Sequence, residues 1–342
     1  MSSSIPKTMR ALVQPDRTST NLILTTLPVP TPTPNTSEHL IHVHCVAPCP
    51  GELLWPKLFP PPNLRDTWIP CYDMAGTVVT SPPGSPFRVG DEVYCRANYA
   101  RQGCASDYTI SVTEEMAHKP KHLDWVQSAA IPLSAQTAWE GLFVHSGIGD
   151  FNSPSWKGKR ILVTAASGAV GMWMTQIGKV IGATIIATCG PDNVSLVKSL
   201  GADEVLNYRE TNLKSWALAS PDNRVDLFFD SVGGDSLGDA WWTLKDGSML
   251  MSIVQPDTSG ARPAGCEVKD VKEVFFIMEP SRERLESVTK LVDEGKCRSV
   301  VDSVWPLEQF EMVYRRLGGG AFDRSVGGHT KGKIVMDLRL NQ

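Results

Sequence analysis

The segment 160–171, RILVTAASGAVG, constrains the fold of this chain more than any other. An apolar strand runs into the spacing Ala166-x-Gly168-x-x-Gly171, and a helix-forming run follows. Small residues let the backbone turn sharply and approach a pyrophosphate, whose charge meets the free amides of the helix N-terminus. This context favours a dinucleotide-binding turn, and the alternative is a close-packed turn without a ligand. The predicted cofactor contacts here are Ala166, Ser167, Gly168, Ala169, Val170 and Gly171.

Strand and helix patterns alternate along the middle of the chain. Predicted helices at 170–181 and 194–200 follow the first two strands. This βαβ rhythm is typical of a doubly wound parallel sheet. The last strand is the candidate edge, along which two copies would pair in a homodimer. The predicted strands cover 160–166, 184–189, 205–208, 225–231 and 247–254.

The first third of the chain is rich in proline-containing turns. Short predicted strands at 39–46 and 76–80, and a turn at 89–93 that leads into a third, indicate a β-rich, barrel-like domain. Near the C-terminus the sequence returns to the pattern of the first third. Helices are predicted there at 281–294 and 307–317, and a last strand at 333–338. We therefore expect an α/β protein of two domains, residues 1–125 with 279–342 and residues 126–278.

Composition excludes several classes of protein. Apolar residues make up 42% of the 342 residues, which is ample for a folded core. Lys and Arg number 33 and Asp and Glu 37, and the net charge of −4 indicates neither a nucleic-acid partner nor a membrane surface. Eight cysteines are too few for a disulfide scaffold. With no apparent signal peptide or spanning helix, we expect a reduced, cytoplasmic protein.

The end of the second predicted strand bears on the choice of cofactor. Sites that prefer NADH usually place an acidic residue there to bind the ribose 2′-hydroxyl. Here the strand ends Ala-Thr-Cys-Gly at 187–190, and Asp192 comes three residues late. The absence of an acid favours NADPH over NADH, although the turn also lacks Lys and Arg. The residues expected to hold the 2′-phosphate are Gly190, Asn193 and Tyr208.

Five further segments carry a family resemblance. They are IPCYDMAGTVV at 69–79, VGDEV at 89–93, AAIPLSAQTAW at 129–139, LGADEVLNY at 200–208 and KGKIV at 331–335. With the glycine turn, they make the chain similar to the medium-chain dehydrogenase/reductase family, in its zinc-free branch of quinone oxidoreductases and zeta-crystallin-like enzymes. Two more segments, GELLW at 51–55 and CGPDNVSLVKSLGA at 189–202, resemble fungal reductases that include trans-acting enoyl reductases of polyketide pathways. The resemblance implies a GroES-like β-barrel catalytic domain and a Rossmann domain.

A metal site is not expected. His42 and His44 alternate with Cys45 along one strand, so the three side chains cannot converge on one ion. Zinc-dependent relatives hold their catalytic zinc with Cys, His and Cys, and the matching positions here are Cys49, Tyr72 and about Leu133. One thiolate does not make such a site. Without zinc as a Lewis acid, reduction of a conjugated alkene or a quinone is favoured over oxidation of an alcohol.

Two catalytic candidates come from the resemblance. Tyr72 stands where zinc relatives have a metal ligand, so its phenol is a candidate donor to a developing oxyanion; the alternative is a core tyrosine bonded to backbone. Thr137 matches a position that lies beside the nicotinamide in relatives, and its alternative is a buried or helix-capping hydroxyl. Cys49 replaces the Asn of many zinc-free relatives, and we expect a buried thiol there among the cofactor contacts.

The remaining site residues are placed by resemblance alone. Val232 is expected near the adenosine ribose, and Ile253 and Val254 near the nicotinamide ribose. An apolar pocket for a flat or aliphatic substrate would use aromatic residues, although each of these is also a reasonable core residue. The pocket candidates are Trp55, Phe59, Tyr72, Trp139 and Phe275.

The sequence therefore predicts an NADPH-dependent oxidoreductase that delivers hydride, without zinc, to a small apolar enone, enoyl compound or quinone. Two alternatives stay open. One is a trans-acting enoyl reductase that works on a carrier protein with a biosynthetic synthase as partner. The other is an NADPH-binding protein without catalytic activity.

Overall fold

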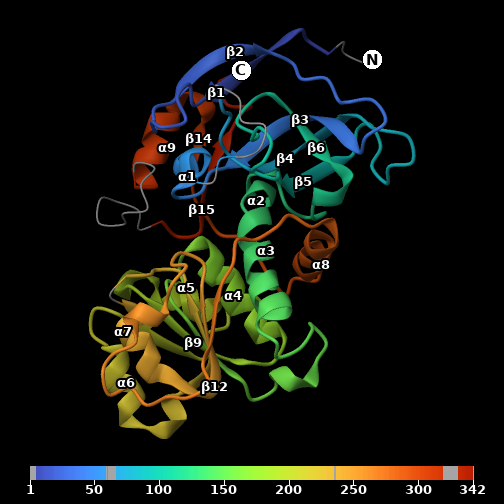
Figure 1. The fold of residues 1–342 in the computed structure, drawn as a ribbon. Coiled ribbons are helices and arrows are strands. Elements are labelled where there is room, and N and C mark those ends of the chain that lie inside the picture. Colours follow the sequence, from blue (N-terminus) through green and yellow to red (C-terminus); the bar gives the residue numbers. More distant parts are fainter. Residues whose placement is uncertain (1–4, 59, 61–66, 235, 319–329, 342) are drawn as a thin grey trace. The chain divides into compact units, whose positions relative to one another are not determined.

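The computed structural model describes residues 5–58, 60, 67–234, 236–318 and 330–341. The chain forms two compact units (Figure 1). The first unit is Met1–Gln136 with Glu279–Gln342, and the second is Thr137–Met278. The first boundary thus follows Gln136, where the sequence had suggested residue 125, because helix α2 (Trp125–Ala129) packs on strands β3 and β4 of the first unit.

The first unit is β-rich. In the part of the chain that the structure describes, its main sheet has seven strands in the order β14-β15-β3-β4-β5-β7, with β6 paired to β3, and β1 pairs with β2 separately. Its buried core includes Leu12, Ile41, Met74 and Met336. This is the GroES-like architecture that the sequence predicts. The strands are β1 Thr8–Val13, β2 Ile23–Pro28, β3 Glu38–Ala47, β4 Asp73–Thr80, β5 Glu92–Arg96, β6 Tyr108–Val112, β7 Met116–His118, β14 Val301–Pro306 and β15 Lys333–Asp337.

Short helices accompany these strands. The helix predicted at 307–317 is a 3-10 turn, Leu307–Gln309, followed by α9. The helix predicted at 281–294 is α8, which begins after Ser281, whose side chain accepts a hydrogen bond from the amide of Arg284. Besides α2, the helices are α1 Trp55–Leu58, α3 Pro132–Glu140, which spans the boundary between the units, α8 Arg282–Asp293 and α9 Phe310–Arg316.

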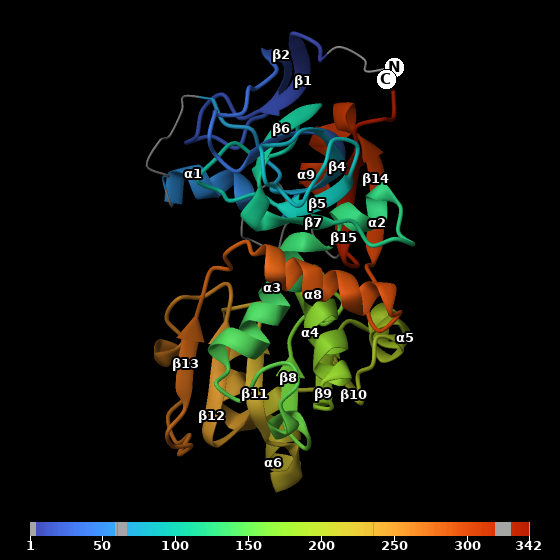
Figure 2. The same cartoon turned by 90° about the vertical axis from the view of Figure 1, so that its right-hand side faces the viewer.

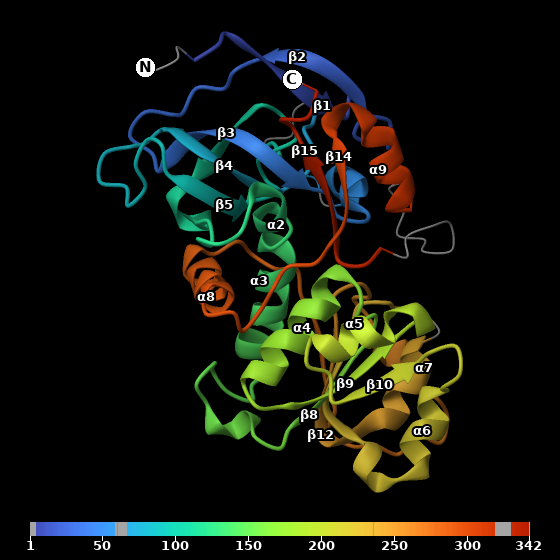
Figure 3. The ribbon, with the colours of Figure 1, turned by 180° about the vertical axis from the view of Figure 1, so that it is seen from behind.

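The second unit is a doubly wound parallel sheet. Its strand order, β10-β9-β8-β11-β12-β13, is the 3-2-1-4-5-6 order of a Rossmann domain. Figure 3 shows α4 and α5 in front of this sheet. Its buried core includes Leu162, Ile186, Phe228 and Leu250. The strands are β8 Arg160–Val163, β9 Thr184–Cys189, β10 Glu204–Asn207, β11 Val225–Asp230, β12 Leu244–Ser252 and β13 Lys272–Phe275, and the helices are α4 Ala169–Val180, α5 Val194–Ser199, α6 Leu213–Ala219 and α7 Ser236–Ala240.

One assignment from the sequence is wrong. The segment 247–254 is not an edge strand, because β12 lies between β11 and β13, as Figure 2 shows. All five residues from Ser248 to Ser252 are buried, as expected for a central parallel strand. The edge is β13, a four-residue strand whose first two residues are exposed and whose pattern gave no strand signal. A homodimer stays a prediction.

No helix in the described residues is long and apolar enough to cross a membrane.

Candidate functional site

The glycine turn joins the carboxyl end of β8 to α4. Ala165 adopts a left-handed φ of 45°, so the strand ends at Val163 rather than at the predicted residue 166. The amide of Ala166 donates to the carbonyl of Thr188 in β9 at 2.8 Å, which fixes the turn against the sheet. Gly168 precedes α4, and no side chain caps this helix. The amides of its first turn are therefore available to an anion, as a pyrophosphate site requires.

Gly171 is required by packing. A Cβ atom at this position would lie 2.4 Å from the carbonyl oxygen of Ala165 and 2.8 Å from the Cα of Ala166. A Cβ at Gly168 would lie 3.1 Å from the same carbonyl oxygen, a tight but far milder contact. The first turn of α4 thus approaches the end of β8 closely only because residue 171 has no side chain. The residues present fit the cradle of a dinucleotide.

The ends of β9 and β10 bring three of the predicted phosphate contacts together. A Cβ at Gly190 would lie 3.4 Å from the hydroxyl of Tyr208, whose side chain is half exposed. The amide nitrogen of Asn193 donates to the hydroxyl of Ser167 at 3.2 Å and links this turn to the glycine turn. The side-chain oxygen of Asn193 is buried and has no hydrogen-bond partner among the described residues. At the carboxyl ends of these strands, one buried side-chain oxygen is therefore without a partner among the described residues.

Asp230 is a residue that the sequence analysis missed. It is fully buried at the end of β11 and accepts hydrogen bonds from the amide of Val232 at 3.0 Å and from the hydroxyl of Ser252 at 2.8 Å. The amide of Ile253 donates to the carbonyl of Asp230 at 3.1 Å. These bonds hold Val232, Ile253 and Val254 at the carboxyl edge of the sheet, where open α/β sheets bind ligands. An acid at a strand end, three residues before the pair Gly233-Gly234, was the available signal.

The other predicted residues of the second unit lie in α3 and in the edge strand β13. Trp139 stacks on Phe151, with ring centroids 5.2 Å apart and an interplanar angle of 12°, inside a cluster of aromatic side chains. Thr137 is buried in α3. Phe275 is half-buried in the edge strand β13, opposite Ser252. The remaining pocket candidate, Phe59, lies outside the described residues.

Tyr72 is the centre of an aromatic group in the first unit. It lies directly before β4 and is 2% exposed. The indole N–H of Trp68 donates to its hydroxyl at 2.6 Å, and Trp55 stacks on its ring with centroids 5.4 Å apart. The guanidinium of Arg96 lies 5.6 Å from the centre of the Tyr72 ring, and Tyr99 packs edge-on against Trp55 at 6.5 Å. Of these residues, the sequence analysis missed Trp68, Arg96 and Tyr99.

The backbone before Tyr72 is held in an uncommon conformation. Cys71 has a left-handed φ of 62°, which is uncommon for a residue other than glycine. A Cβ at Gly103 would lie 2.4 Å from the carbonyl oxygen of Pro70 and 2.6 Å from those of Ile69 and Cys71. The amide of Gly103 donates to the Ile69 carbonyl at 2.8 Å. This close packing fixes the position of Tyr72.

Charged groups are buried beside this aromatic group. The ammonium of Lys333 lies 3.0 Å from the carboxylate of Asp73, with side chains 4% and 1% exposed. Asp73 also accepts a hydrogen bond from the amide of Leu133 at 2.8 Å. Burial alone would lower the pKa of Lys333, but the neighbouring acidic groups, of which Asp73 contributes most, together outweigh it and raise that pKa. Burial raises the pKa of Glu52, whose carboxylate accepts a hydrogen bond from the Tyr314 hydroxyl at 2.6 Å.

The donor set does not fit a catalytic zinc. At the three positions where zinc relatives have ligands, Leu133 has no donor atom, and the hydroxyl of Tyr72 already accepts the bond from Trp68. The thiol of the half-buried Cys49 is then the one donor left at these three positions, and one thiolate does not make such a site. Among the described residues, no three His, Cys, Asp or Glu side chains form a group suited to a metal ion.

The two histidines of β3 take part in packing. His42 stacks on Tyr108 at 5.0 Å, and His44 packs against Trp125 at 4.4 Å. The Nε2 atom of His44 lies 2.9 Å from the hydroxyl of Thr77. Burial lowers the pKa of His44 from its ordinary value of 6.5 to about 4. The ring is therefore neutral in the folded protein at neutral pH.

His44 should make the protein less stable in mild acid. The unfolded chain binds a proton at His44 below pH 6.5, whereas the folded chain does so only near pH 4, so stability falls as the pH falls through this window. We expect a loss on the order of 1–2 kcal/mol between pH 7 and pH 4.5, because the half-buried ring is partly screened. Urea unfolding at both pH values measures it, and His44→Gln should remove this part of the pH dependence. Parallel profiles for the two proteins would contradict it.

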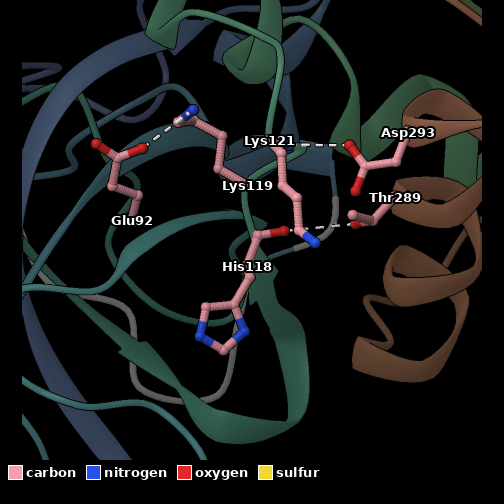
Figure 4. Close-up of a pocket in the computed structure, with 6 residues that line it drawn as sticks. All are labelled: Glu92, His118, Lys119, Lys121, Thr289 and Asp293. Atoms are coloured by element: carbon pink, nitrogen blue, oxygen red, sulfur yellow. Dashed lines mark hydrogen bonds and ion pairs between the residues drawn. The ribbon is translucent and has the colours of Figure 1, made fainter.

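The first unit also contains a cavity away from these residues. It has a volume of about 430 Å³, and none of the predicted site residues lines it. Figure 4 shows its charged side chains: Lys119 pairs with Glu92 at 3.1 Å, and Asp293 accepts the backbone amide of Lys121 at 2.9 Å. Two lysines and two carboxylates line the cavity, so neither sign of charge prevails in it. Its lining residues are Glu92, His118, Lys119, Lys121, Thr289 and Asp293.

Comparisons with known proteins agree with this architecture. Residues 35–121 match the alcohol dehydrogenase GroES-like domain, and residues 200–336 match a family described as zinc-binding dehydrogenase. A protein of Arthroderma benhamiae named probable zinc-binding oxidoreductase, mitochondrial, is 47% identical over 339 residues, which cover 98% of each chain. The chloroplast envelope quinone oxidoreductase homolog of Arabidopsis thaliana is 30% identical and covers 90% of this chain and 92% of its own.

The fold is also found in solved structures. The quinone oxidoreductase from Coxiella burnetii superimposes with a TM-score of 0.76 at 24% identity, and the match covers 97% of this chain and 100% of that one. The similarity to the Arthroderma protein extends over nearly the whole length of both chains. The chain therefore belongs to the medium-chain dehydrogenase/reductase family of nicotinamide-dependent oxidoreductases, among relatives named quinone oxidoreductases and zinc-binding oxidoreductases.

Proposed function

We propose that this protein is an NADPH-dependent reductase that delivers hydride to a quinone or to an activated C=C bond without zinc. The observation that carries the proposal is the phenol of Tyr72. Its oxygen accepts the indole N–H of Trp68, so its own proton is left for another acceptor. Tyr72 stands where zinc-dependent relatives have a metal ligand. A hydrogen-bond donor at this position would stabilise a developing oxyanion, as the metal does in those relatives.

The second unit would hold the cofactor. The free amides at the start of α4 would receive the pyrophosphate, and Ser167, Asn193 and Tyr208 would surround the 2′-phosphate. NADPH is favoured over NADH because no acidic residue ends β9, where a carboxylate would repel the 2′-phosphate. The nicotinamide, when bound, supplies the hydride. Val232, Ile253 and Val254 would line the ribose positions.

The absence of zinc from the proposed mechanism rests on the donor set. The family description and the name of the Arthroderma relative both mention zinc. A catalytic zinc needs three protein ligands and an open position. Leu133 cannot ligate, and the hydroxyl of Tyr72 already accepts the indole N–H of Trp68, which leaves the thiol of Cys49 alone. We therefore assign no step to a metal.

The compound that accepts the hydride would bind at the aromatic group of the first unit. Trp55 and Tyr99 are half-buried and would offer a flat, apolar wall for a conjugated ring or chain. Tyr72 would donate its hydrogen bond to the carbonyl oxygen of the acceptor. Thr137 stays a candidate beside the nicotinamide. The relatives named quinone oxidoreductases support a quinone or a related conjugated carbonyl compound as the acceptor.

Tyr72→Phe removes this donor and keeps the ring. We expect kcat to fall about 10- to 100-fold, because a hydrogen bond to a charged oxygen is worth roughly 1.5–3 kcal/mol. Affinity for NADPH should stay within twofold. Steady-state kinetics with a quinone and an enone, together with a fluorescence titration of NADPH, provide the measurement. An unchanged kcat would remove Tyr72 from the mechanism.

The proposed function is tested by oxidation of NADPH and NADH with three acceptors: a benzoquinone, an α,β-unsaturated ketone and an enoyl thioester. Turnover with the quinone or the ketone, faster with NADPH, supports the proposal. Turnover with the thioester alone would favour the enoyl reductase of a biosynthetic pathway. Binding of NADPH without turnover on any acceptor would favour a protein without catalytic activity.

Zinc analysis of the purified protein should find less than about 0.1 equivalent, and a stoichiometric, tightly held ion would overturn the zinc-free mechanism.

The cytoplasmic location stays a prediction, since the Arthroderma relative is named as mitochondrial.

A further inference from the structure

We propose that Trp68 is a positioning residue, which fixes the direction in which the Tyr72 hydroxyl donates its hydrogen bond to the carbonyl oxygen of the acceptor. The inference rests on the proposed function, and it narrows the substrate class to acceptors that carry a carbonyl oxygen conjugated to the carbon that is reduced. Neither the family resemblance nor the names of the relatives assigns a role to Trp68.

The first step is the polarity of the hydrogen bond. An indole nitrogen can only donate, so in the 2.6 Å contact the phenol oxygen of Tyr72 is the acceptor. The phenol proton must then point away from Trp68. No residue in the described part of the chain accepts it: the hydrogen bond from Trp68 is the one the structure gives for the Tyr72 hydroxyl. Tyr72 therefore has a buried hydroxyl whose proton has no acceptor among the described residues.

The second step is the rigidity of the donor. Trp68 is 2% exposed, and its backbone is bridged to Gln14 by two hydrogen bonds, from the Gln14 amide at 2.7 Å and from its own amide at 3.0 Å. On the other side of Tyr72, the close contacts of Gly103 with the carbonyls of residues 69–71 hold the backbone. Both partners of the bond are therefore fixed before a substrate arrives, which is the condition for a preorganised donor.

The third step is the charge beside the ring. The guanidinium of Arg96 lies 5.6 Å from the centre of the Tyr72 ring, and its Nη1 donates to the Ala97 carbonyl at 2.9 Å. Its Nε is buried and has no hydrogen-bond partner among the described residues. The cation of Arg96 favours negative charge on an oxygen bound at Tyr72, and it acts against the carboxylate of Glu52, which opposes such a charge. Burial raises the pKa of Tyr72, so the proton stays on the phenol, and the group acts as a hydrogen-bond donor rather than as an acid.

The test is a double-mutant cycle of Trp68→Phe and Tyr72→Phe, with kcat and KM measured for a quinone and for an enone at saturating NADPH. Trp68→Phe should lower kcat about 3- to 10-fold, because the phenol proton can then rotate, while KM for NADPH stays within twofold. In the Tyr72→Phe background, Trp68→Phe should have no further effect on kcat.

The matched control is Trp156→Phe. Trp156, in the second unit, is also fully buried, and its indole N–H donates to the carbonyl of Asp150 at 2.9 Å. This variant should leave kcat within twofold. Should Trp68→Phe fail to fold, replacing Trp68 by benzothienylalanine keeps the shape of the ring and removes only the N–H, with the same decrease in kcat expected.

The outcomes separate the two claims. An unchanged kcat in Tyr72→Phe overturns the role proposed for Tyr72 and the inference with it. A low kcat in Tyr72→Phe combined with a normal kcat in Trp68→Phe overturns only the role of Trp68. The same conclusion follows if the two effects multiply in the double variant, because Trp68 would then act independently of Tyr72.

Discussion

Lys333→Met should lower the free energy of unfolding by about 3–5 kcal/mol, the usual effect of removing one partner of a buried ion pair. The variant leaves the carboxylate of Asp73 uncompensated in a site that is 1% exposed. The amide of Leu133 still donates to Asp73, but one hydrogen bond does not replace a charge. Urea unfolding followed by circular dichroism at pH 7 measures the loss.

Two controls test the cause of this loss. The double variant Asp73→Asn with Lys333→Met removes both charges and keeps a side-chain oxygen for the Leu133 amide, so it should recover at least half of the loss. Arg282→Met breaks the pair between Arg282 and Glu286, whose side chains are 34% and 48% exposed, and should cost under about 1 kcal/mol. If Lys333→Met is no more destabilising than Arg282→Met, the buried pair does not stabilise the fold as argued.

Gly171→Ala should weaken NADPH binding about 100-fold and destabilise the second unit by about 3 kcal/mol, the upper end of the range for overpacking. The added Cβ would meet backbone atoms of Ala165 and Ala166, which cannot rotate away as a flexible side chain would. Relief of the contact requires the first turn of α4 to move, and the free amides move with it. A fluorescence titration of NADPH and a thermal unfolding scan measure the two effects.

Gly168→Ala is the matched control in the same turn. Its Cβ meets the Ala165 carbonyl oxygen at 3.1 Å, a contact that a shift of a few tenths of an ångström relieves. We expect less than a tenfold loss of NADPH affinity and less than about 1 kcal/mol of stability for this variant. Equal effects at the two glycines would show that sensitivity to a methyl group is a general property of the turn and is not specific to the packing of Gly171.

The sequence predicted the second unit better than the first because its signals are local. The strand–turn–helix at 160–171 and the strands that follow carry their own periodicity, and the order β10-β9-β8-β11-β12 is the usual one of the doubly wound sheet that this periodicity predicts. The edge failed because β13 is a short KEVF segment without a β-branched run, so 247–254 appeared to be the last strand. The position of Ala165 in the left-handed region was also beyond prediction, since nothing in an alanine indicates it.

The aromatic group around Tyr72 shows what one-dimensional patterns miss. Tyr72 and Trp55 were found through the resemblance, but Arg96 is at the end of β5 and Tyr99 is in the loop that follows. Their proximity to Tyr72 depends on the antiparallel pairing of β4 with β5, which sets Asp73 opposite Arg96. A buried arginine gives no signal in a sequence, because arginine is usually exposed. The bond from Trp68 depends likewise on side-chain geometry four residues before Tyr72.

The close approach of Gly103 to three carbonyl groups limits which residues of the proposed acceptor site can be redesigned. Position 103 accepts no side chain, so substitutions in the segment from Arg96 to Gly103 must leave Gly103 unchanged. Tyr99 can still be varied, since it is half-buried, packs against the core from outside and meets Trp55 edge-on. A library that varies Tyr99 and leaves the glycine intact would alter the shape offered to acceptors while the frame beneath Tyr72 stays as it is.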